Sequence, residues 1–508
     1  MEAFEEKSRP EPSARQSWEA IVFAHLVPES YVLQEFPDGV RLLLVDGTPD
    51  VTPDVTIRHR STKYLAEPGK LGEIELAQAY VRGDLEVDDE GLPKLLGIIL
   101  STLQEETLEV AAARNELYTA EYLPEGVWRD LLVIPNIYDV TRIFSARIKK
   151  TIQEILLNAN IASVNCRMPL AEKLIDKLNI AFHYDLPQTV YDLMLGDPDS
   201  NGEETAYTCA YLGDPKKINR PCEEQDVEPM TLTKGQSNKF ELNARKLGLH
   251  RPAEEGEKEK LDILDVGCGS ASEIIYYVTN FRERIGKVVG ITLSKRQLEE
   301  GRRKVEEAGL SDVIELRYQN YQDLDQSEKF DRVLSVGMAE AVGIDHLGDY
   351  AQKINDVMSD EGRGLIHLIT TNRGVEGTPG EKMGQNSSFI STRIFPGGQL
   401  PTVAEIKEAL GNAGLTIEHE HQFGFYYYET TRRWFKNWCD REFEIIKALQ
   451  EDGQLSPKKA VKKHREYKLY LAGVSQMFLQ RVIDLTQLTV NKNGSQKDDS
   501  AMEEWMAA

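Results

Sequence analysis

The sequence predicts an α/β protein built on a mostly parallel sheet. From Leu261 onward short apolar runs alternate with stretches of helical periodicity, such as residues 273–284 and 295–308. The apolar runs end at Asp265, Leu293, near Tyr318, at Val336 and at Ile369. The composition, 41% hydrophobic and 28% charged, is that of a folded domain. Such alternation favours a sheet covered on both faces, with ligands bound at the carboxyl ends of its strands.

Charge and composition exclude several function classes. The chain has 508 residues, enough for roughly two to four domains of ordinary size. Its 84 acidic and 60 basic residues give a net charge of −24, so we expect no nucleic-acid partner. No apolar run approaches the ~20 residues that cross a bilayer, and residues 1–15 lack an apolar signal core, which predicts a cytoplasmic location. The five cysteines form no Cys-x-x-Cys pair, so no metal site is predicted.

Composition also suggests domain boundaries. We expect a disordered leader, a small accessory α+β domain, a helical connector that runs into the catalytic domain, the catalytic domain with a helical C-terminal extension, and a polar tail. In that order they span residues 1–17, 18–110, 111–200, 201–490 and 491–508. Within them, residues 215–260 have few apolar side chains, so at least part of this segment is interpreted as a surface connection, and residues 431–488 are predicted to be helical.

A glycine turn follows the first strand of the catalytic domain. The segment Leu261–Gly269 reads Leu-Asp-Ile-Leu-Asp-Val-Gly-Cys-Gly and leads into a helix, where two glycines let a ligand approach the backbone. A dinucleotide fingerprint would need a third glycine at position 272, which is Ser272. Asp265, two residues before Gly267, instead fits the first motif of S-adenosylmethionine (SAM) methyltransferases. A purely structural turn is the alternative interpretation.

Polar side chains also follow the next two strands. Thr292, Leu293 and Gln297 stand where a ribose would lie, although Ser294 could also serve as a plain helix cap. Asn320 and Tyr321 follow the third strand and could satisfy and stack an adenine, or could simply cap a loop.

Together these motifs resemble cyclopropane-fatty-acyl-phospholipid synthases, members of the SAM-dependent methyltransferase superfamily, over roughly residues 70 to 490. The resemblance rests on motifs that occur in the family's order: Tyr207-Thr-Cys-Ala-Tyr211, Gly267-Cys-Gly269, Gly290–Ser294 with Gln297, Phe330–Glu340, Leu365–Ile369 and Phe423–Tyr427. It implies a Rossmann-like fold and methyl transfer from SAM to the double bond of an unsaturated acyl chain in a phospholipid.

The resemblance also implies the site residues. Family members hold a bicarbonate ion as the base, and the matching positions are Cys209, Glu340, His367, Ile369 through its backbone, and Tyr427. The cofactor-binding set is Tyr207, Thr208, Asp265, Gly267, Gly269, Thr292, Leu293, Gln297, Asn320 and Tyr321. Singly, a buried cysteine or a histidine in an apolar strand is ordinary core. Their joint occurrence within matching motifs favours the catalytic interpretation.

Two departures leave the product open. Ser270-Ala271-Ser272 stands where the family has Trp-Gly-Gly, and Ala339-Glu340-Ala341 where it has Phe-Glu-His. Proton loss from the transferred methyl closes a cyclopropane, whereas loss from a neighbouring carbon gives a methylene-branched chain that a separate reductase could saturate to a methyl branch. The alternatives are a small-molecule N- or C-methyltransferase of the same family and a catalytically inactive lipid-binding protein.

The remaining expectation concerns partners. Residues 457–468 read Pro-Lys-Lys-Ala-Val-Lys-Lys-His-Arg-Glu-Tyr-Lys, a dense positive run in an acidic chain. It is either a solvated helix face or a patch that draws the protein to anionic headgroups as a peripheral membrane protein. A second copy of the chain, as a homodimer, is a further candidate partner.

Overall fold

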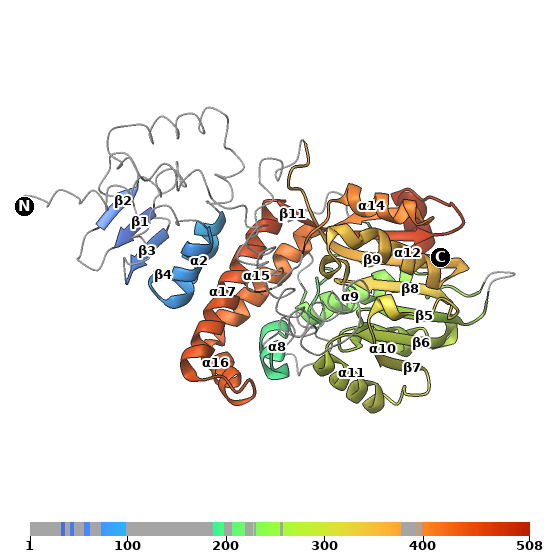
Figure 1. Cartoon of the computed structure of the whole chain (residues 1–508), viewed down its shortest axis with the longest axis horizontal. Coiled ribbons are helices and arrows are strands. Elements are labelled where there is room, and N and C mark those ends of the chain that lie inside the picture. Colours follow the sequence, from blue (N-terminus) through green and yellow to red (C-terminus); the bar gives the residue numbers. More distant parts are fainter. Residues whose placement is uncertain are drawn as a thin grey trace, which may run out of the picture. The chain divides into compact units, whose positions relative to one another are not determined.

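The computed structural model describes residues 32–35, 41–44, 55–60, 73–97, 186–197, 206–218, 227, 230–253, 258–376, 394 and 399–507. The chain divides into two units, Met1–Ile134 and Pro135–Ala508 (Figure 1). The predicted leader, residues 1–17, and most of the predicted connector, residues 111–200, lie outside the described residues.

The first unit contains a small mixed sheet. Its strands are β1 (Val32–Glu35), β2 (Arg41–Leu44), β3 (Val55–His59) and β4 (Leu85–Val87), in the order β2-β1-β3-β4. β1 and β3 are parallel, and the other pairs are antiparallel. Helix α2 (Glu73–Arg82) precedes β4 and buries Ala79 and Tyr80. These elements agree with the predicted small α+β unit.

The second unit is organised around a seven-stranded sheet in the order β10-β11-β9-β8-β5-β6-β7. The strands are β5 (Leu261–Val266), β6 (Ile285–Thr292), β7 (Ile314–Tyr318), β8 (Phe330–Val336), β9 (Met358–Thr371), β10 (Thr416–Gln422) and β11 (Ile483–Asn491). β5 to β9 are mutually parallel, and β11 lies antiparallel between β9 and β10. The predicted mostly parallel sheet is confirmed.

Helices cover both faces of this sheet (Figure 1). On one face α9 (Leu232–Lys246), α10 (Ser272–Asn280) and α11 (Lys295–Glu307) bury Phe240, Ile274 and Leu298 in one apolar cluster. On the other, α12 (Leu347–Val357) and α14 (Val403–Asn412) bury Ile354 and Leu410 in a second cluster. The chain order reverses between β5 and β8, which is the switch point where an open α/β sheet binds ligands.

The helical C-terminal region lies between the last two strands in the sequence. It comprises α15 (Gly424–Asp440), α16 (Glu442–Glu451) and α17 (Pro457–Leu479), which pack with α8 (Gln188–Leu195) and bury Trp434 and Trp438. The prediction of helix throughout residues 431–488 is therefore wrong at its end, where β11 begins at Ile483. β11 is buried on both faces, and its apolar alternation changes phase at Thr486 and Gln487, so no single period of two marks it as a strand.

Two other segments contain helices that the composition did not indicate. Within residues 215–260, at least part of which was expected to be a surface connection, α9 is a core helix that buries Lys239, Asn243 and Lys246 among its apolar side chains. The supposed polar tail, residues 491–508, contains α18 (Asp499–Ala507), which buries Met502 and Met506 and stacks Trp505 against Arg363. In both helices the inward residues recur at helical spacing, but they are too polar or too few to dominate the composition.

Candidate active site

The glycine turn lies at the switch point. Gly267 and Gly269 have φ angles of 96° and 55°, a left-handed conformation that favours glycine. A Cβ atom at Gly267 would lie 3.1 Å from Cβ and Cγ of Met338, in the loop that follows β8. The loops after β5 and β8 therefore approach each other closely, and a side chain at Gly267 would require Met338 to move in addition to straining the backbone.

Ala271 ends the same turn in the left-handed region, with a φ angle of 66°, at a position where the family resemblance leads us to expect glycine. This conformation costs an alanine about 1 kcal/mol. The backbone at Ala271 thus keeps the left-handed conformation that a glycine would adopt, although the residue is an alanine.

The loop after β6 brings Gln297 to the glycine turn. The Ser294 hydroxyl caps α11 by accepting a hydrogen bond from the Gln297 backbone N–H at 3.3 Å, and the Ser294 N–H donates to Oγ1 of Thr292 at 3.1 Å. A Cβ atom at Gly269 would lie 3.9 Å from Nε2 of Gln297. Ser294 is therefore a helix cap, and the Gln297 side chain lies beside the turn. Thr292 is buried and Leu293 is partly exposed.

The loop after β7 carries Asn320 and Tyr321. Oδ1 of the buried Asn320 accepts the Gln322 N–H at 3.0 Å, so this side chain does cap the loop. The Tyr321 ring lies edge-on to Tyr350 of α12, with centroids 5.7 Å apart. The Gln319 N–H donates to the Thr292 carbonyl at 3.3 Å, which ties this loop to the end of β6.

Behind the glycine turn, Asp265 is buried beside an ion pair between α9 and α10. Nζ of Lys239 donates to Oε2 of Glu273 at 2.6 Å, and Oε1 of Glu273 accepts from Asn243 and Tyr277. Burial raises the pKa of Asp265 well above its usual range, the Glu273 charge adds to this, and Lys239 opposes it. Hydrogen-bond donors on a bound ligand would favour the ionised form of Asp265.

Glu340 lies in a short 3₁₀ turn, Ala339–Ala341, after β8. Its Oε1 accepts the Ile369 backbone N–H of β9 at 2.8 Å, while Oε2 is buried and has no hydrogen-bond partner within the described part of the chain. Burial raises the pKa of Glu340 to about 7, and the Ile369 bond only partly offsets this. The structure thus brings together two residues of the predicted base-binding set, with the Ile369 N–H holding the carboxylate.

His367 lies two residues before Ile369 on β9, and its carbonyl accepts the Gly337 N–H at 2.8 Å. Burial, followed by the nearby Lys239 and Lys246 charges, lowers the pKa of His367 well below its usual range, so the imidazole is neutral. Its ring packs edge-on against Phe423, with centroids 5.9 Å apart.

Cys209 lies on a segment that runs along α15. It is fully buried, with Sγ 4.0 Å from the Thr430 hydroxyl, and that hydroxyl also accepts the Ala210 N–H at 3.1 Å. Just before it, the Thr208 carbonyl accepts from Nε2 of the buried Gln236 at 2.5 Å. These bonds fix the segment between α9 and α15.

Aromatic rings gather around Tyr427 of α15. Tyr427 stacks on Phe478 of α17 with centroids 4.6 Å apart, and Trp434 packs against both Tyr427 and Tyr207. The Tyr207 hydroxyl donates to that of Tyr470 at 3.0 Å, and burial raises the pKa of Tyr207 well above its usual range. This cluster is apolar, with neutral hydroxyls at its edges.

The predicted residues therefore form two groups, Glu340 with Ile369 and His367, and Cys209 with Tyr207 and Tyr427. Phe423, at the start of α15, joins them, since its ring contacts both His367 and Tyr211, two residues after Cys209. Sequence reasoning missed the buried polar residues behind His367, which are Lys239, Asn243 and Lys246 of α9 and Gln487 of β11. The spacing of 239, 243 and 246 on one helix face was the available signal.

A parallel sheet with this switch point, a left-handed glycine turn and buried polar residues at the ends of β5, β6 and β7 define a SAM-dependent methyltransferase. The fold is shared with a coclaurine N-methyltransferase structure, at a TM-score of 0.51 and 14% identity over 82% of this chain and 99% of that one. The profile of the mycolic acid cyclopropane synthetase family matches residues 172–488, and the chain belongs to that family.

Curated relatives agree with this assignment. A probable fatty acid methyltransferase of Pseudomonas putida is 33% identical over 322 residues, which are 63% of this chain and 71% of that protein. Cyclopropane mycolic acid synthase 2 of Mycobacterium leprae is 29% identical over 325 residues, 61% of this chain and 92% of that protein. Within the described ranges no helix is both long enough and apolar enough to span a membrane.

Proposed function

We propose that this methyltransferase acts on the double bond of an unsaturated fatty acyl chain in a phospholipid, and that a bicarbonate ion serves as its base. The observation that carries the proposal is the Glu340 carboxylate, which no lysine or arginine of the described residues neutralises. Its Oε1 is held by Ile369, and its buried Oε2 has no hydrogen-bond partner among the residues that the structure describes. Buried polar atoms of native proteins are nearly always paired, so this oxygen has the character of a ligand-binding atom.

The donor set fits a bicarbonate ion. Glu340, with a pKa of about 7, can hold a proton and donate it to an anion, and neutral His367 and Tyr427 can each donate a hydrogen bond. Cys209 lies on the adjoining segment. No lysine or arginine is part of this set, so a bound anion would keep its basicity.

The aromatic cluster fits an olefin as the acceptor. An isolated double bond is a weak nucleophile, so methyl transfer depends on close positioning. SAM, when bound, supplies the electrophilic methyl group. The faces of Tyr207, Tyr427, Trp434 and Phe478 would stabilise the positive charge that develops on the acyl chain and would exclude water from it. The same apolar surface suits a fatty acyl chain.

The first turns of α17 fit a membrane surface. Lys458, Lys459 and Lys462 are exposed, and Val461 between them is 45% exposed. Tyr467 and Lys468 of the same basic run are buried, as is Tyr470 just beyond it, so the contact would be narrower than the sequence suggests. Each lysine near an anionic surface contributes about 1 kcal/mol, so the three exposed lysines together would strengthen vesicle binding roughly 100-fold at low salt.

The test is mass spectrometry of phospholipid vesicles incubated with the purified chain, SAM and bicarbonate. Vesicles with cis-unsaturated chains should gain one methylene unit per modified acyl chain, and saturated vesicles should not react. Nuclear magnetic resonance of the product distinguishes a cyclopropane from a branched chain. No mass gain, or methylation of an amine headgroup instead, would contradict the proposal.

Vesicle sedimentation tests the membrane contact. Changing Lys458, Lys459 and Lys462 together to Gln should weaken binding to anionic vesicles and leave SAM affinity unchanged. The matched control changes the exposed Lys216, Lys217 and Lys260 in the same way. Equal losses in both triple variants would mean that net charge, and not this surface, governs binding.

A further inference from the structure

A chain of buried polar side chains runs from the ion pair behind the glycine turn to His367. It passes from Glu273 through Asn243 to Gln487, which also contacts Lys246 and His367. Asn243, Lys246 and Gln487 have no exposed surface, and Glu273 and His367 have 8% and 2%. In such surroundings each donor must meet an acceptor, so the direction of every hydrogen bond is constrained.

Lys246 sets the orientation of the Gln487 amide. A lysine ammonium only donates hydrogen bonds, and Nζ of Lys246 lies 2.8 Å from Oε1 of Gln487. The opposite orientation would place two donors face to face. The Gln487 oxygen therefore faces Lys246, and its Nε2 amino group faces the other way.

The far end of the chain imposes the same orientation independently. The Glu273 carboxylate, paired with Lys239, only accepts, so Nδ2 of Asn243 donates to it at 2.7 Å. Oδ1 of Asn243 is then left facing Gln487 and requires a donor, which Nε2 of Gln487 supplies at 2.6 Å. The positive charge of Lys246 and the negative charge of Glu273 therefore require the same orientation of the Gln487 amide.

The orientation of the Gln487 amide determines which ring nitrogen of His367 carries the proton. Nε2 of Gln487 also lies 3.0 Å from Nδ1 of His367 and donates to it. A neutral imidazole carries one proton, and since Nδ1 accepts, that proton is on Nε2.

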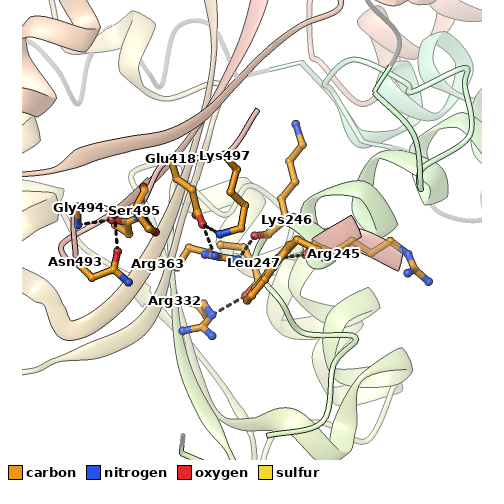
Figure 2. A network of polar contacts seen from close by, with 12 residues as sticks. Arg245, Lys246, Leu247, Arg332, Arg363, Glu418, Asn493, Gly494, Ser495 and Lys497 are labelled. Carbon is orange, nitrogen blue, oxygen red and sulfur yellow. Dashed lines mark hydrogen bonds and ion pairs between the residues drawn. The ribbon is translucent and has the colours of Figure 1, made fainter. Parts of the chain in front are cut away.

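Side chains from other elements donate hydrogen bonds to the carbonyl groups at the C-terminal end of helix α9. Arg363 donates to the Lys246 carbonyl, Arg332 to that of Leu247 and Trp505 to that of Arg245. Figure 2 shows that the Lys246 side chain extends away from this network. Residues from β8, β9 and α18 thus cap the helix and fix the base from which Lys246 reaches Gln487.

We propose that Gln487 is a positioning residue that locks His367 as the Nε2–H tautomer, so that the imidazole presents a hydrogen-bond donor to the anionic base of the reaction. The tautomer follows from the contacts above, and its role in catalysis rests on the proposed function. The same bonds connect the cofactor side of the site, at Glu273, with the base side, at His367.

The wild-type protein gives the first test. With ¹⁵N-labelled histidine, long-range nitrogen–proton correlation spectra distinguish a protonated from an unprotonated ring nitrogen, and His367→Asn identifies the His367 signals by their loss. We expect a protonated Nε2 and an unprotonated Nδ1. A proton on Nδ1 in the folded wild-type chain would overturn the proposal without any Gln487 variant having to fold.

Gln487→Glu is the second test. The variant carboxylate can still accept from Lys246, but it cannot donate to Nδ1 of His367, so it favours a proton on Nδ1. We expect a tautomer change or an imidazolium signal at His367. We also expect kcat on unsaturated phospholipid vesicles to fall at least about tenfold, with the Kd for SAM within about threefold of wild type. Unchanged histidine spectra and unchanged kcat would overturn the proposal.

The matched control is Thr486→Val, on the same strand but on the opposite face. It breaks the buried bond between the Thr486 and Thr370 hydroxyls, which lie 2.9 Å apart, and leaves the polar chain intact. His367 should keep its wild-type spectrum in this variant, and a tautomer change there would count against a specific role for Gln487. Absence of wild-type turnover on the vesicles would contradict the proposed function, whereas the tautomer measurement stands independently.

Discussion

Replacing Glu340 with Gln should make the protein more stable at high pH while it abolishes most of the activity. Gln keeps the oxygen that accepts the Ile369 N–H and removes the buried charge. Burial raises the pKa of Glu340 from 4.5 to about 7. Because each pKa unit corresponds to about 1.4 kcal/mol, the ionised carboxylate costs the folded state roughly 3 kcal/mol.

The pH dependence has a defined sign. Near pH 4.5 and below, Glu340 is protonated in the folded state, so Gln and Glu should give similar free energies of unfolding. Between pH 4.5 and 7 the unfolded chain releases its proton while the folded chain retains it, and wild-type stability falls. The advantage of Glu340→Gln should therefore rise from near zero to about 3 kcal/mol by pH 8.

Urea unfolding followed by tryptophan fluorescence, in bicarbonate-free buffer at pH 5 and pH 8, measures this difference. Glu408→Gln removes an exposed carboxylate from α14 and is the matched control. SAM affinity should stay within a few-fold, because Glu340 belongs to the proposed base site and not to the proposed cofactor set. A stability difference that does not grow with pH would refute the burial argument, and normal turnover would refute the catalytic one.

Three further predictions follow from the cofactor side of the site and from the basic run. Gly267→Val should abolish SAM binding by calorimetry, whereas Gly309→Val should not. Both positions have positive φ, but only Gly267 would press a side chain against Met338, and nothing lies within 4 Å at Gly309. Lys239→Met should lower the free energy of unfolding, measured in urea, by about 3–5 kcal/mol, because it leaves the buried Glu273 carboxylate without its cation. Adding Glu273→Gln to this variant should restore much of the lost stability. A double variant that is no more stable than Lys239→Met would contradict this explanation. Binding of the wild type to anionic vesicles should weaken steadily with added salt, and salt-insensitive sedimentation would leave Lys458, Lys459 and Lys462 as a solvated surface.

The strands that carry the cofactor site were predictable because each is a short apolar run that ends in a functional loop. The predicted ends of two apolar runs, Asp265 and Val336, lie within one residue of the observed ends of β5 and β8. The paired motifs also placed Glu340 and Ile369 in one site, and the structure joins them by a hydrogen bond. A resemblance was needed for this step, since neither residue type is diagnostic alone.

The polar interior could not be predicted in the same way. Lys239, Asn243 and Lys246 make α9 look like a surface helix, because burial of a lysine is worthwhile only when partners from other elements reach it. Those partners, Glu273 and Gln487, lie on α10 and β11, and nothing local in the sequence pairs them with α9. The basic run of residues 457–468 likewise does not show that Tyr467 faces inward, where it packs against Trp438, or that the following Tyr470 bonds to Tyr207.

The position of β11 has a consequence for how the protein is made. This strand lies between β9 and β10, yet it follows both of them and the helices α15, α16 and α17 in the chain, so a ribosome delivers it after its two neighbours. Until it arrives, β9 has an open edge, and His367 lacks the Gln487 amide that faces it. The site around His367 is therefore complete only after β11 has joined the sheet. A nascent chain that stops before Ile483 would expose the edge of β9 to pairing with another chain, and it would lack the Gln487 side chain that contacts His367.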